Sequence, residues 1–360
     1  MPPPRHVVVG GAGVMGGAVA YYLARRGVRV TLIERSGVAC AASGKSGGFL
    51  ALDWCDDSPL GPLARASFAL HGELARELRA DYGYRRVETL MLRAREGAAV
   101  AGGHRATPPA WLDGAAVLLG ALGTTETTAQ LHPARFTAAL VDGATAHGAT
   151  LRMGCVEDVV TGDGRVTGVR VDGETIEADA VVLALGPWTG RLARRLGLPR
   201  VRGLKGYSVT LVGARVPAQA LFVDYRTAAG RHLEPEIVPR ADGDVYVCGM
   251  ADPAPLPDSP DDVTVSEEAC DTLARAAASV SSALAGARID RRQACYRPVT
   301  DDGLPLIGRV PAMAGAFVAT GHGPWGMLNA PATGLALAEL IADGAAKHVD
   351  LGAFDPARRG

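Results

Sequence analysis

The first 34 residues contain the pattern that most restricts how this chain can fold. Residues 6–10 (His-Val-Val-Val-Gly) form a continuous apolar run that is typical of a buried parallel strand. Gly11-Ala12-Gly13-Val14-Met15-Gly16 follows, then a helical stretch over 18–26 and a second apolar strand over 28–33 that ends at Glu34. Strand, glycine turn, helix and strand in this order predict an α/β fold whose first turn binds a dinucleotide.

Each residue type in this turn has a physical reason. Gly11 permits the tight turn, Gly13 lets a pyrophosphate approach the backbone, and Gly16 lets the helix pack on the strand. The N–H groups at the start of the helix and its dipole attract phosphate. Glu34 can accept hydrogen bonds from ribose hydroxyls and argues against a 2′-phosphate. The alternative interpretation is a glycine-rich turn that binds nothing.

Composition supports a folded protein with a large cofactor. The chain has 46 glycines in 360 residues, where ordinary usage would give about 25. Thirteen of them lie in segments that we expect to line the dinucleotide: Gly10, Gly11, Gly13, Gly16, Gly17, Gly44, Gly47, Gly48, Gly303, Gly308, Gly321, Gly323 and Gly326. A net charge of −1 argues against a nucleic-acid partner, and 21% charged residues beside 48% hydrophobic ones exclude a disordered chain.

The six cysteines are scattered without paired spacing, which favours free thiols over a disulfide framework or a metal site. We therefore expect no bound metal. The sequence shows neither a secretion signal nor an apolar run of the ~18 residues that a membrane span requires. We predict a cytoplasmic protein that does not contact a membrane, and we make no prediction of its oligomeric state.

The middle of the chain distinguishes between dinucleotides. We expect a helix over 133–147, strands over 150–154 and 156–160, and hairpin turns at 162–164 and 172–173. A buried strand over 178–186 then ends in Gly186, before Pro187 and Trp188. A glycine-terminated strand after such a three-stranded meander is typical of Rossmann-type proteins that bind FAD rather than NAD.

Three segments then resemble the D-amino acid oxidase family of FAD-dependent oxidoreductases, which includes glycine and sarcosine oxidases. They are the first glycine turn with Glu34, Arg297-Pro298-Val299-Thr300-Asp301-Asp302-Gly303-Leu304-Pro305-Leu306-Ile307-Gly308, and Gly321-His322-Gly323-Pro324-Trp325-Gly326-Met327. The segment Ala42-Ser43-Gly44-Lys45-Ser46-Gly47-Gly48-Phe49-Leu50 is most similar to a branch of uncharacterised oxidoreductases within the family.

This resemblance implies FAD as cofactor and assigns roles to individual residues. Arg297 would hold a substrate carboxylate, and backbone N–H groups of the 321–327 turn, which leads into an expected helix over 332–342, would face the flavin. Phe49 and Trp325 complete the candidate catalytic set with Arg297 and Glu236. The expected cofactor contacts are Gly11, Ala12, Gly13, Val14, Met15, Gly16, Glu34, Arg35, Ser43, Gly44, Lys45, Gly48, Val156, Gly186, Trp188, Gly321, His322, Gly323, Trp325, Gly326 and Met327.

Two positions depart from the family or leave alternatives open. Amino acid oxidases often place an aromatic hydroxyl near the position of Glu236. A carboxylate there, or at Glu234, would favour a substrate that donates hydrogen bonds, unless both acids face solvent or pair with Arg240 or Arg231. Cys295 matches the cysteine that carries the flavin in sarcosine oxidases, so a covalent link is one alternative and a buried thiol with non-covalent FAD is the other.

We therefore expect a discontinuous FAD-binding domain (1–60, 130–200 and 295–360) and an antiparallel-sheet substrate domain (61–129 and 201–294). The implied reaction oxidises the C–N bond of an amino acid or secondary amine to an imine, by hydride transfer to flavin N5, with O2 as the expected acceptor and H2O2 as product. The alternatives are a dehydrogenase with another acceptor, a flavin monooxygenase, and a non-catalytic FAD-binding assembly or trafficking factor.

Overall fold

A six-stranded sheet organises the first half of the fold. The computed structural model describes residues 3–103, 105–311 and 313–358. The strand order is β19-β20-β12-β1-β2-β8, and β1 lies between β12 and β2 and is parallel to both. β19 pairs antiparallel with β20 at one edge. The bounds are β1 His6–Gly10, β2 Arg29–Glu34, β8 Thr150–Met153, β12 Ala180–Leu183, β19 Leu306–Arg309 and β20 Ala316–Thr320.

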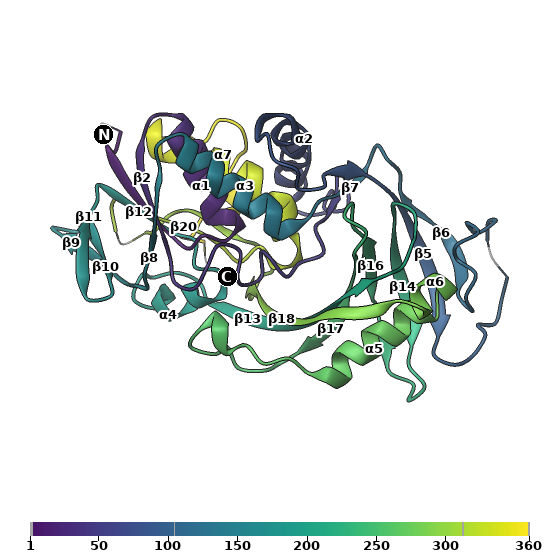
Figure 1. The fold of residues 1–360 in the computed structure, drawn as a ribbon. Coiled ribbons are helices and arrows are strands. Elements are labelled where there is room, and N and C mark those ends of the chain that lie inside the picture. The colour runs from purple at the N-terminus through teal and green to yellow at the C-terminus, as the bar shows by residue number, and fades with distance from the viewer. Residues whose placement is uncertain (1–2, 104, 312, 359–360) are drawn as a thin grey trace.

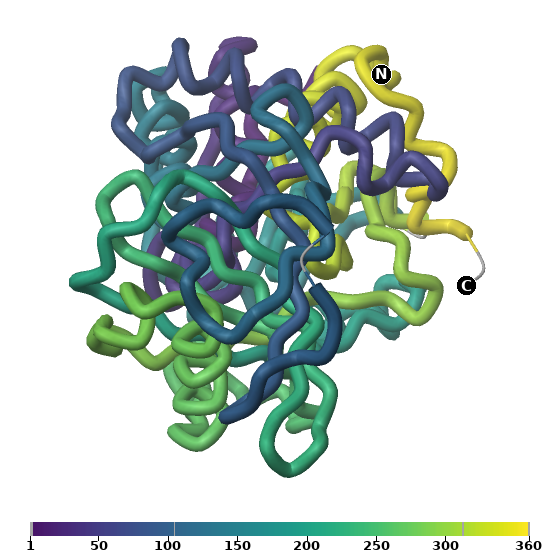
Figure 2. The backbone as a smooth tube through the Cα atoms, turned by 90° about the vertical axis from the view of Figure 1, so that its right-hand side faces the viewer, coloured from purple at the N-terminus to yellow at the C-terminus, as the bar shows by residue number. Residues whose placement is uncertain are grey.

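Both faces of this sheet are covered, as its continuous apolar strands require. Val7 and Val9 of β1 pack towards four helices, whereas Val8 between them packs towards a three-stranded meander. The last long helix of the chain, α7, lies beside α1, which is the first helix of the chain (Figures 1 and 2). The bounds are α1 Val14–Arg25, α2 Gly61–Glu77, α3 Pro133–Ala146 and α7 Gly326–Ala342, with the meander β9 Val156–Gly162, β10 Arg165–Val171 and β11 Glu174–Glu177.

The meander turns confirm the two predicted hairpins. Asp163 and Gly164 have φ values of 49° and 73°, and Asp172 and Gly173 have φ values of 49° and 82°. Two consecutive residues with positive φ match the twist of the flanking strands, and Asp-Gly adopts this conformation readily.

A larger sheet forms the other half, with the order β18-β13-β17-β16-β14-β5-β6 and β15 paired to β14. It is antiparallel except for the parallel pair of β14 with β5. Helix α5 lies along β13, β17 and β18 (Figure 1). The bounds are β5 Glu88–Arg95, β6 Val117–Gly123, β13 Val201–Val212, β14 Gln219–Arg226, β15 His232–Leu233, β16 Glu236–Pro239, β17 Val245–Asp252, β18 Arg288–Thr300, α5 Glu267–Ala278 and α6 Ser282–Ala285.

A small sheet and several short helices complete the fold. The small sheet has the order β3-β7-β4 and brings residues after the first strand-helix-strand unit next to residues before α3. The bounds are β3 Phe49–Ala51, β4 Arg85–Arg86, β7 Thr128–Gln130, α4 Gly190–Ala193, η1 Gly186–Thr189, η2 Pro260–Asp262, η3 Gly323–Trp325 and η4 Gly352–Phe354.

Two predicted elements need correction at their ends. The strand expected over 178–186 is confined to Ala180–Leu183, because the chain turns into η1 at Gly186. The helix expected over 332–342 already begins at Gly326 and contains Pro331 within it. The division of the chain into two domains at the predicted boundaries stays a prediction.

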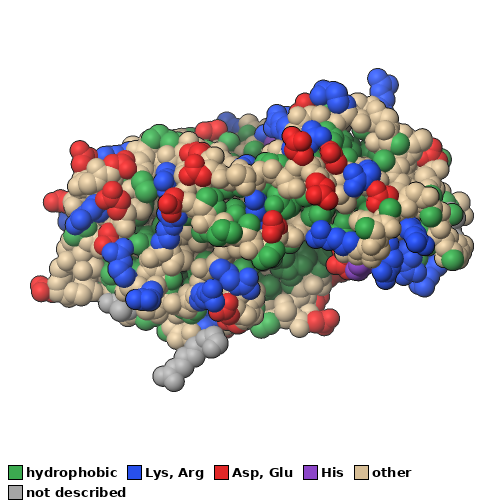
Figure 3. Space-filling view, turned by 90° about the horizontal axis from the view of Figure 1, so that it is seen from below, with side chains coloured by type: hydrophobic (Ala, Val, Ile, Leu, Met, Phe, Trp, Pro, Cys, Tyr) green, Lys and Arg blue, Asp and Glu red, His purple; other side chains and the backbone are tan. Residues whose placement is uncertain are grey.

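Within the described ranges, no helix combines the length and the apolar character needed to cross a bilayer. Figure 3 shows basic and acidic side chains interspersed over much of one face.

Helix α7 depends on a side chain from α2 at its proline. Pro331 has no N–H group, so the carbonyl of Met327 one turn earlier has no partner within the helix. The fully buried His71 lies at this point, and its Nε2 donates to the carbonyl oxygens of Met327 (3.0 Å) and Leu328 (3.1 Å). Burial lowers the pKa of His71 to about 4, so the imidazole is neutral at pH 7.

We predict that His71→Leu lowers the free energy of unfolding by about 1–3 kcal/mol, because it leaves these buried carbonyls without a donor. In a Pro331→Ala background the N–H group of residue 331 donates to the Met327 carbonyl. His71→Leu should therefore lower the free energy of unfolding by at least about 1 kcal/mol less than it does with Pro331 present. Urea denaturation of the four proteins of this cycle provides the measurement. An identical cost in both backgrounds would contradict the proposed link.

Candidate dinucleotide and substrate site

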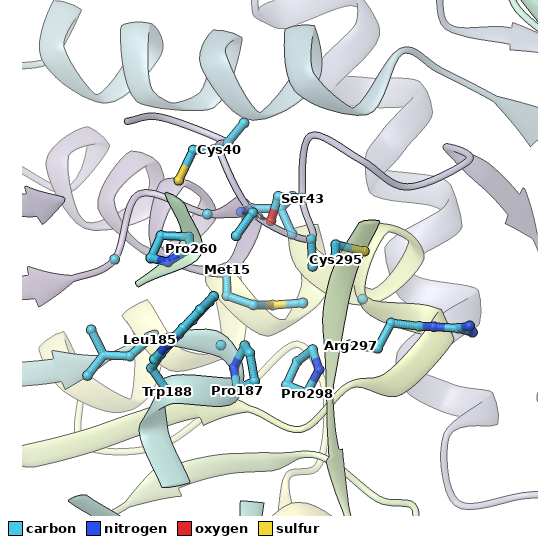
Figure 4. Close-up of a pocket in the computed structure, with 18 of the residues that line it drawn as sticks. Met15, Cys40, Ser43, Leu185, Pro187, Trp188, Pro260, Cys295, Arg297 and Pro298 are labelled. Carbon is cyan, nitrogen blue, oxygen red and sulfur yellow. Dashed lines mark hydrogen bonds between the residues drawn. The ribbon is translucent and has the colours of Figure 1, made fainter. Parts of the chain in front are cut away.

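A cavity of about 410 Å³ opens at the carboxyl ends of the parallel strands and is walled on its other side by the large sheet. Gly11, Glu34, Gly186 and Thr320 line it from the strand ends, which is the usual ligand position in such a sheet. Figure 4 shows Met15 near its middle, Cys40, Trp188 and Pro260 towards one end, and Arg297 at the other.

The first glycine turn is shaped by close backbone approaches. Gly11 has φ +96°, and a Cβ there would lie 2.4 Å from the carbonyl oxygen of Ala184. A Cβ on Gly16 would lie 1.8 Å from the carbonyl oxygen of Gly11. Only glycine fits at both positions, so helix α1 begins directly against β1 and points its N-terminus into the cavity.

Glu34 joins this turn to the end of β2. Its carboxylate accepts hydrogen bonds from the backbone N–H groups of Ala12 (2.7 Å) and Ser36 (3.0 Å), and the side chain is 9% exposed. The carboxylate lines the cavity with lone pairs to spare, as the predicted ribose contact requires.

A connection from the large sheet closes the same end of the cavity. Arg35 donates to the carbonyl of Asp258 (2.7 Å), and Trp188 Nε1 donates to the carbonyl of Pro257 (2.9 Å). Arg191 bonds the Asp258 carboxylate at 2.6 Å. These three contacts form a clamp that brings Pro260 into the cavity wall (Figure 4). Pro260 was not predicted from the sequence because it lies in the connection between β17 and α5.

Another missed residue, Tyr246 of β17, holds the loop before β3. Its hydroxyl donates to the carbonyl of Lys45 at 2.9 Å, and its ring packs closely on Gly47, where a Cβ would lie 3.2 Å away. Arg240 donates to the carbonyl of Ser46 at 3.0 Å. The sequence of this strand does not show which of its side chains face the cavity.

The turn before α7 is fixed by its histidine. His322 is buried, and its Nε2 lies in hydrogen-bonding distance of Thr333 Oγ1 (3.1 Å). Burial lowers the pKa of His322 to about 3, so the ring is neutral. The turn therefore places Gly323, Gly326 and Met327 along the cavity wall by backbone geometry.

The large sheet contributes charge at the other end. Arg297 and Cys295 lie two residues apart on β18, and Glu236 lies on β16; all three line the cavity. Within the described residues, the Arg297 guanidinium forms no hydrogen bond and no ion pair within 4.0 Å. Burial raises the pKa of Glu236, and the nearby Arg297 opposes this rise. Burial also raises the pKa of the Cys295 thiol, which disfavours the thiolate; the covalent link stays untested.

The structure brings most of the predicted site residues together. Those that line the cavity are Gly11, Gly13, Val14, Met15, Glu34, Arg35, Ser43, Lys45, Val156, Gly186, Trp188, Glu236, Arg297, His322, Gly323, Gly326 and Met327. Seven others stand behind or beside the wall: Ala12, Gly16, Gly44, Gly48, Phe49, Gly321 and Trp325.

The glycines behind the wall act through close packing. A Cβ on Gly44 would lie 2.1 Å from the carbonyl oxygen of Ala39, and one on Gly48 would lie 2.0 Å from that of Leu131. Gly321 has φ +80° and faces Thr300. Their direct contact with a cofactor stays a prediction.

The fold and this cavity define a protein that binds a dinucleotide between a Rossmann-type sheet and a second sheet. Two buried polar atoms on the wall, Ser46 Oγ and His322 Nδ1, have no hydrogen-bond partner among the described residues. Such atoms need a polar partner, and the polar ring atoms of a bound cofactor fit this requirement.

Comparisons with known proteins specify the class. The profile of the FAD-dependent oxidoreductase family (DAO) matches residues 6–340. "Putative oxidoreductase C1F5.03c" of Schizosaccharomyces pombe is 30% identical over 98% of each chain. Glycine oxidase of Geobacillus kaustophilus is 30% identical over 93% of this chain and 92% of the relative. A crystal structure of glycine oxidase from Geobacillus kaustophilus is 27% identical, with a TM-score of 0.82 and full coverage of both chains.

The chain therefore belongs to the family of FAD-dependent oxidoreductases, and FAD is its cofactor. This confirms the predicted family, the fold class and the cofactor. The first glycine turn was recognisable in the sequence because Gly11 and Gly16 make backbone approaches that other residue types would block.

We predict that Glu34→Gln weakens FAD binding about 10- to 100-fold, because charge-assisted hydrogen bonds of about 1.5–3 kcal/mol are lost. Reconstitution of the apoprotein with FAD measures the dissociation constant. Glu174→Gln, which changes an exposed carboxylate of the meander that pairs with Arg152, is the matched control and should leave the affinity unchanged. Equal affinities for the two variants would contradict the assigned role of Glu34.

Proposed function

We propose that this protein oxidises the C–N bond of an amino acid or of a secondary amine that carries a carboxylate, giving an imine, with O2 reduced to H2O2. One observation carries the proposal: the Arg297 guanidinium, which has no hydrogen-bond or ion-pair partner among the described residues, lies in the cavity wall with the half-buried carboxylate of Glu236 nearby. The two groups are complementary to a zwitterion, since one binds a carboxylate and the other accepts from an ammonium.

The residues of this chain orient the substrate. Arg297 offers a planar pair of N–H donors that fits a carboxylate, and Glu236 accepts hydrogen bonds from the amine on the same sheet face. Ionised Glu236 also takes a proton from the amine, which leaves the nitrogen lone pair free to form the C=N bond. FAD, when bound, accepts the electron pair and the hydrogen that leave the substrate carbon.

The relatives support this reaction class. The glycine oxidase of Geobacillus kaustophilus is by its name an oxidase of the simplest amino acid. Anaerobic mixing with candidate amines tests the proposal, because a substrate must bleach the flavin absorbance. H2O2 on readmission of air then distinguishes an oxidase from a dehydrogenase with another acceptor. If no amine in a broad panel reduces the flavin, the protein is a non-catalytic FAD-binding factor instead.

We predict that Arg297→Met lowers the second-order rate constant of flavin reduction by carboxylate substrates about 10- to 100-fold, since paired charged hydrogen bonds are lost. Stopped-flow spectroscopy measures this rate, and FAD content should not change. Arg292→Met, on the same strand but paired with Asp271 at the surface, is the matched control. Full activity of Arg297→Met with a carboxylate substrate would refute the assignment.

We also predict that kcat/KM rises with pH through the raised pKa of Glu236. Burial favours the protonated carboxyl, so the ionised form that accepts from the amine appears only at higher pH. Glu236→Gln should lower kcat/KM and remove this limb of the pH profile. Glu234→Gln, two residues away and exposed, should retain it. A limb that persists in Glu236→Gln belongs to another group, such as the substrate amine.

A further inference from the structure

Four aromatic side chains from three separate parts of the chain meet at one place. The ring of Trp54 lies 5.1 Å from Phe49, 4.9 Å from Phe222 and 6.4 Å from Trp325, measured between centroids. Phe49 also lies 5.1 Å from Phe222. These residues, called the aromatic quartet below, are four of the ten Phe and Trp residues in the chain.

The quartet stands beside the cavity where Glu236 lies. Phe222 on β14 is the direct antiparallel partner of Glu236 on β16, so both side chains project from the same face of the sheet. Trp325 stands between Pro324 and Gly326, which both line the cavity. Phe49 follows two residues after Gly47 of the cavity wall. Three separate elements therefore bring aromatic rings to the cavity margin.

Core packing alone does not explain the quartet. All four rings are only half-buried, whereas other large aromatic side chains such as Tyr82 and Phe136 are almost completely buried in the core. Phe49, Trp54 and Phe222 belong to none of the buried hydrophobic clusters of the described residues. Clustered, partly exposed aromatic surface beside a polar site indicates a binding surface.

We propose that the aromatic quartet is the subsite for a large apolar or aromatic group of the substrate. This rests on the proposed function, in which Arg297 holds the carboxylate and Glu236 accepts from the amine. The group beyond the amine then reaches Phe222 and its neighbours. The substrates are therefore amino acids or N-substituted amino acids with a bulky apolar group, in preference to glycine.

The geometry of the rings favours an apolar group over a cationic one. A cation binds over an open ring face, within about 6 Å of the centroid. Three of the four ring contacts in the quartet are edge-to-face, with interplanar angles of 63° to 86°, so the edge of one ring covers part of the face of the next. The resulting wall offers C–H edges and partial faces, which suit dispersion contacts with another apolar group.

Binding of carboxylates that cannot be oxidised tests the subsite without turnover. Propanoate and 3-phenylpropanoate differ only in the ring, and their binding to the oxidised holoenzyme is followed through the flavin spectrum. We expect 3-phenylpropanoate to bind at least about tenfold more tightly, which is the contribution of a well-placed aromatic contact. Phe222→Ala should abolish this ratio while leaving propanoate binding unchanged.

Matched variants keep the test decisive. Trp111→Ala changes another half-buried ring, which lies in the connection between β5 and β6 and donates from Nε1 to Gln219 of β14, away from the quartet; this variant should preserve the ratio. Phe222→Leu retains apolar volume but no ring, and serves if Phe222→Ala fails to retain FAD. Equal affinities of the two carboxylates, or equal ratios in Phe222 and Trp111 variants, would overturn the proposal.

Kinetics then connects the subsite to catalysis. Anaerobic flavin reduction by both enantiomers of phenylalanine and by N-benzylglycine should exceed reduction by glycine, and Phe222→Ala should remove the advantage through KM. If no amine reduces the flavin but the carboxylate ratio holds, the proposed function fails and the subsite stands. Faster reduction by glycine than by every bulky substrate would reject the assigned specificity.

Discussion

Two close backbone contacts in the first glycine turn fix the position of the cavity and of the elements around it. Gly16 packs against the carbonyl of Gly11, and Gly11 packs against the carbonyl of Ala184, at distances that no side chain permits. These two approaches bring β1, α1 and β12 together at one point. The N-terminus of α1, the Glu34 carboxylate and the end of β12 all meet the cavity because of them. The remaining helices then cover the sheet that these contacts begin.

The large sheet supplies the chemistry that the first sheet lacks. Its strands line the cavity with a guanidinium, a carboxylate and two thiols, from Arg297, Glu236, Cys248 and Cys295. Strand β18 is continuous over 13 residues and leads directly towards β19 of the other sheet. Arg297 is therefore held by a long strand that pairs with β13 along its length, rather than by a loop, which favours a fixed substrate geometry.

The sequence motifs predicted the first sheet well and the second one poorly, for physical reasons. The strand at 6–10 is apolar without interruption and ends at a glycine, so its predicted bounds are those of β1. Strand β18 was not predicted, because Arg288, Asp290, Arg291 and Arg292 in its first half are all exposed and interrupt the alternation of apolar and polar residues. Helix α7 begins earlier than predicted, since Pro331 and two glycines within it are typical of a turn.

The sequence also did not allow us to predict which side chains of the site face the cavity. Glu236 faces the cavity because of its register with Cys248 of β17. The register of β17 with β13 is in turn shifted by a bulge between Tyr207 and Ser208, which the sequence does not reveal. Trp54 and Phe222 came from segments without any recognisable motif. Their meeting with Phe49 and Trp325 depends on the packing of β3, β14 and η3, which only the folded chain reveals.

The clamp formed by Arg35, Trp188 and Arg191 has a consequence for the stability of the protein. It fastens the connection before α5 over the end of the cavity that Glu34 marks, so both sheets enclose the dinucleotide. A ligand enclosed in this way contacts both sheets and binds only the folded chain, so its binding free energy adds to the stability of the fold. FAD bound there therefore stabilises the folded chain across both sheets, by an amount that grows with its affinity and concentration.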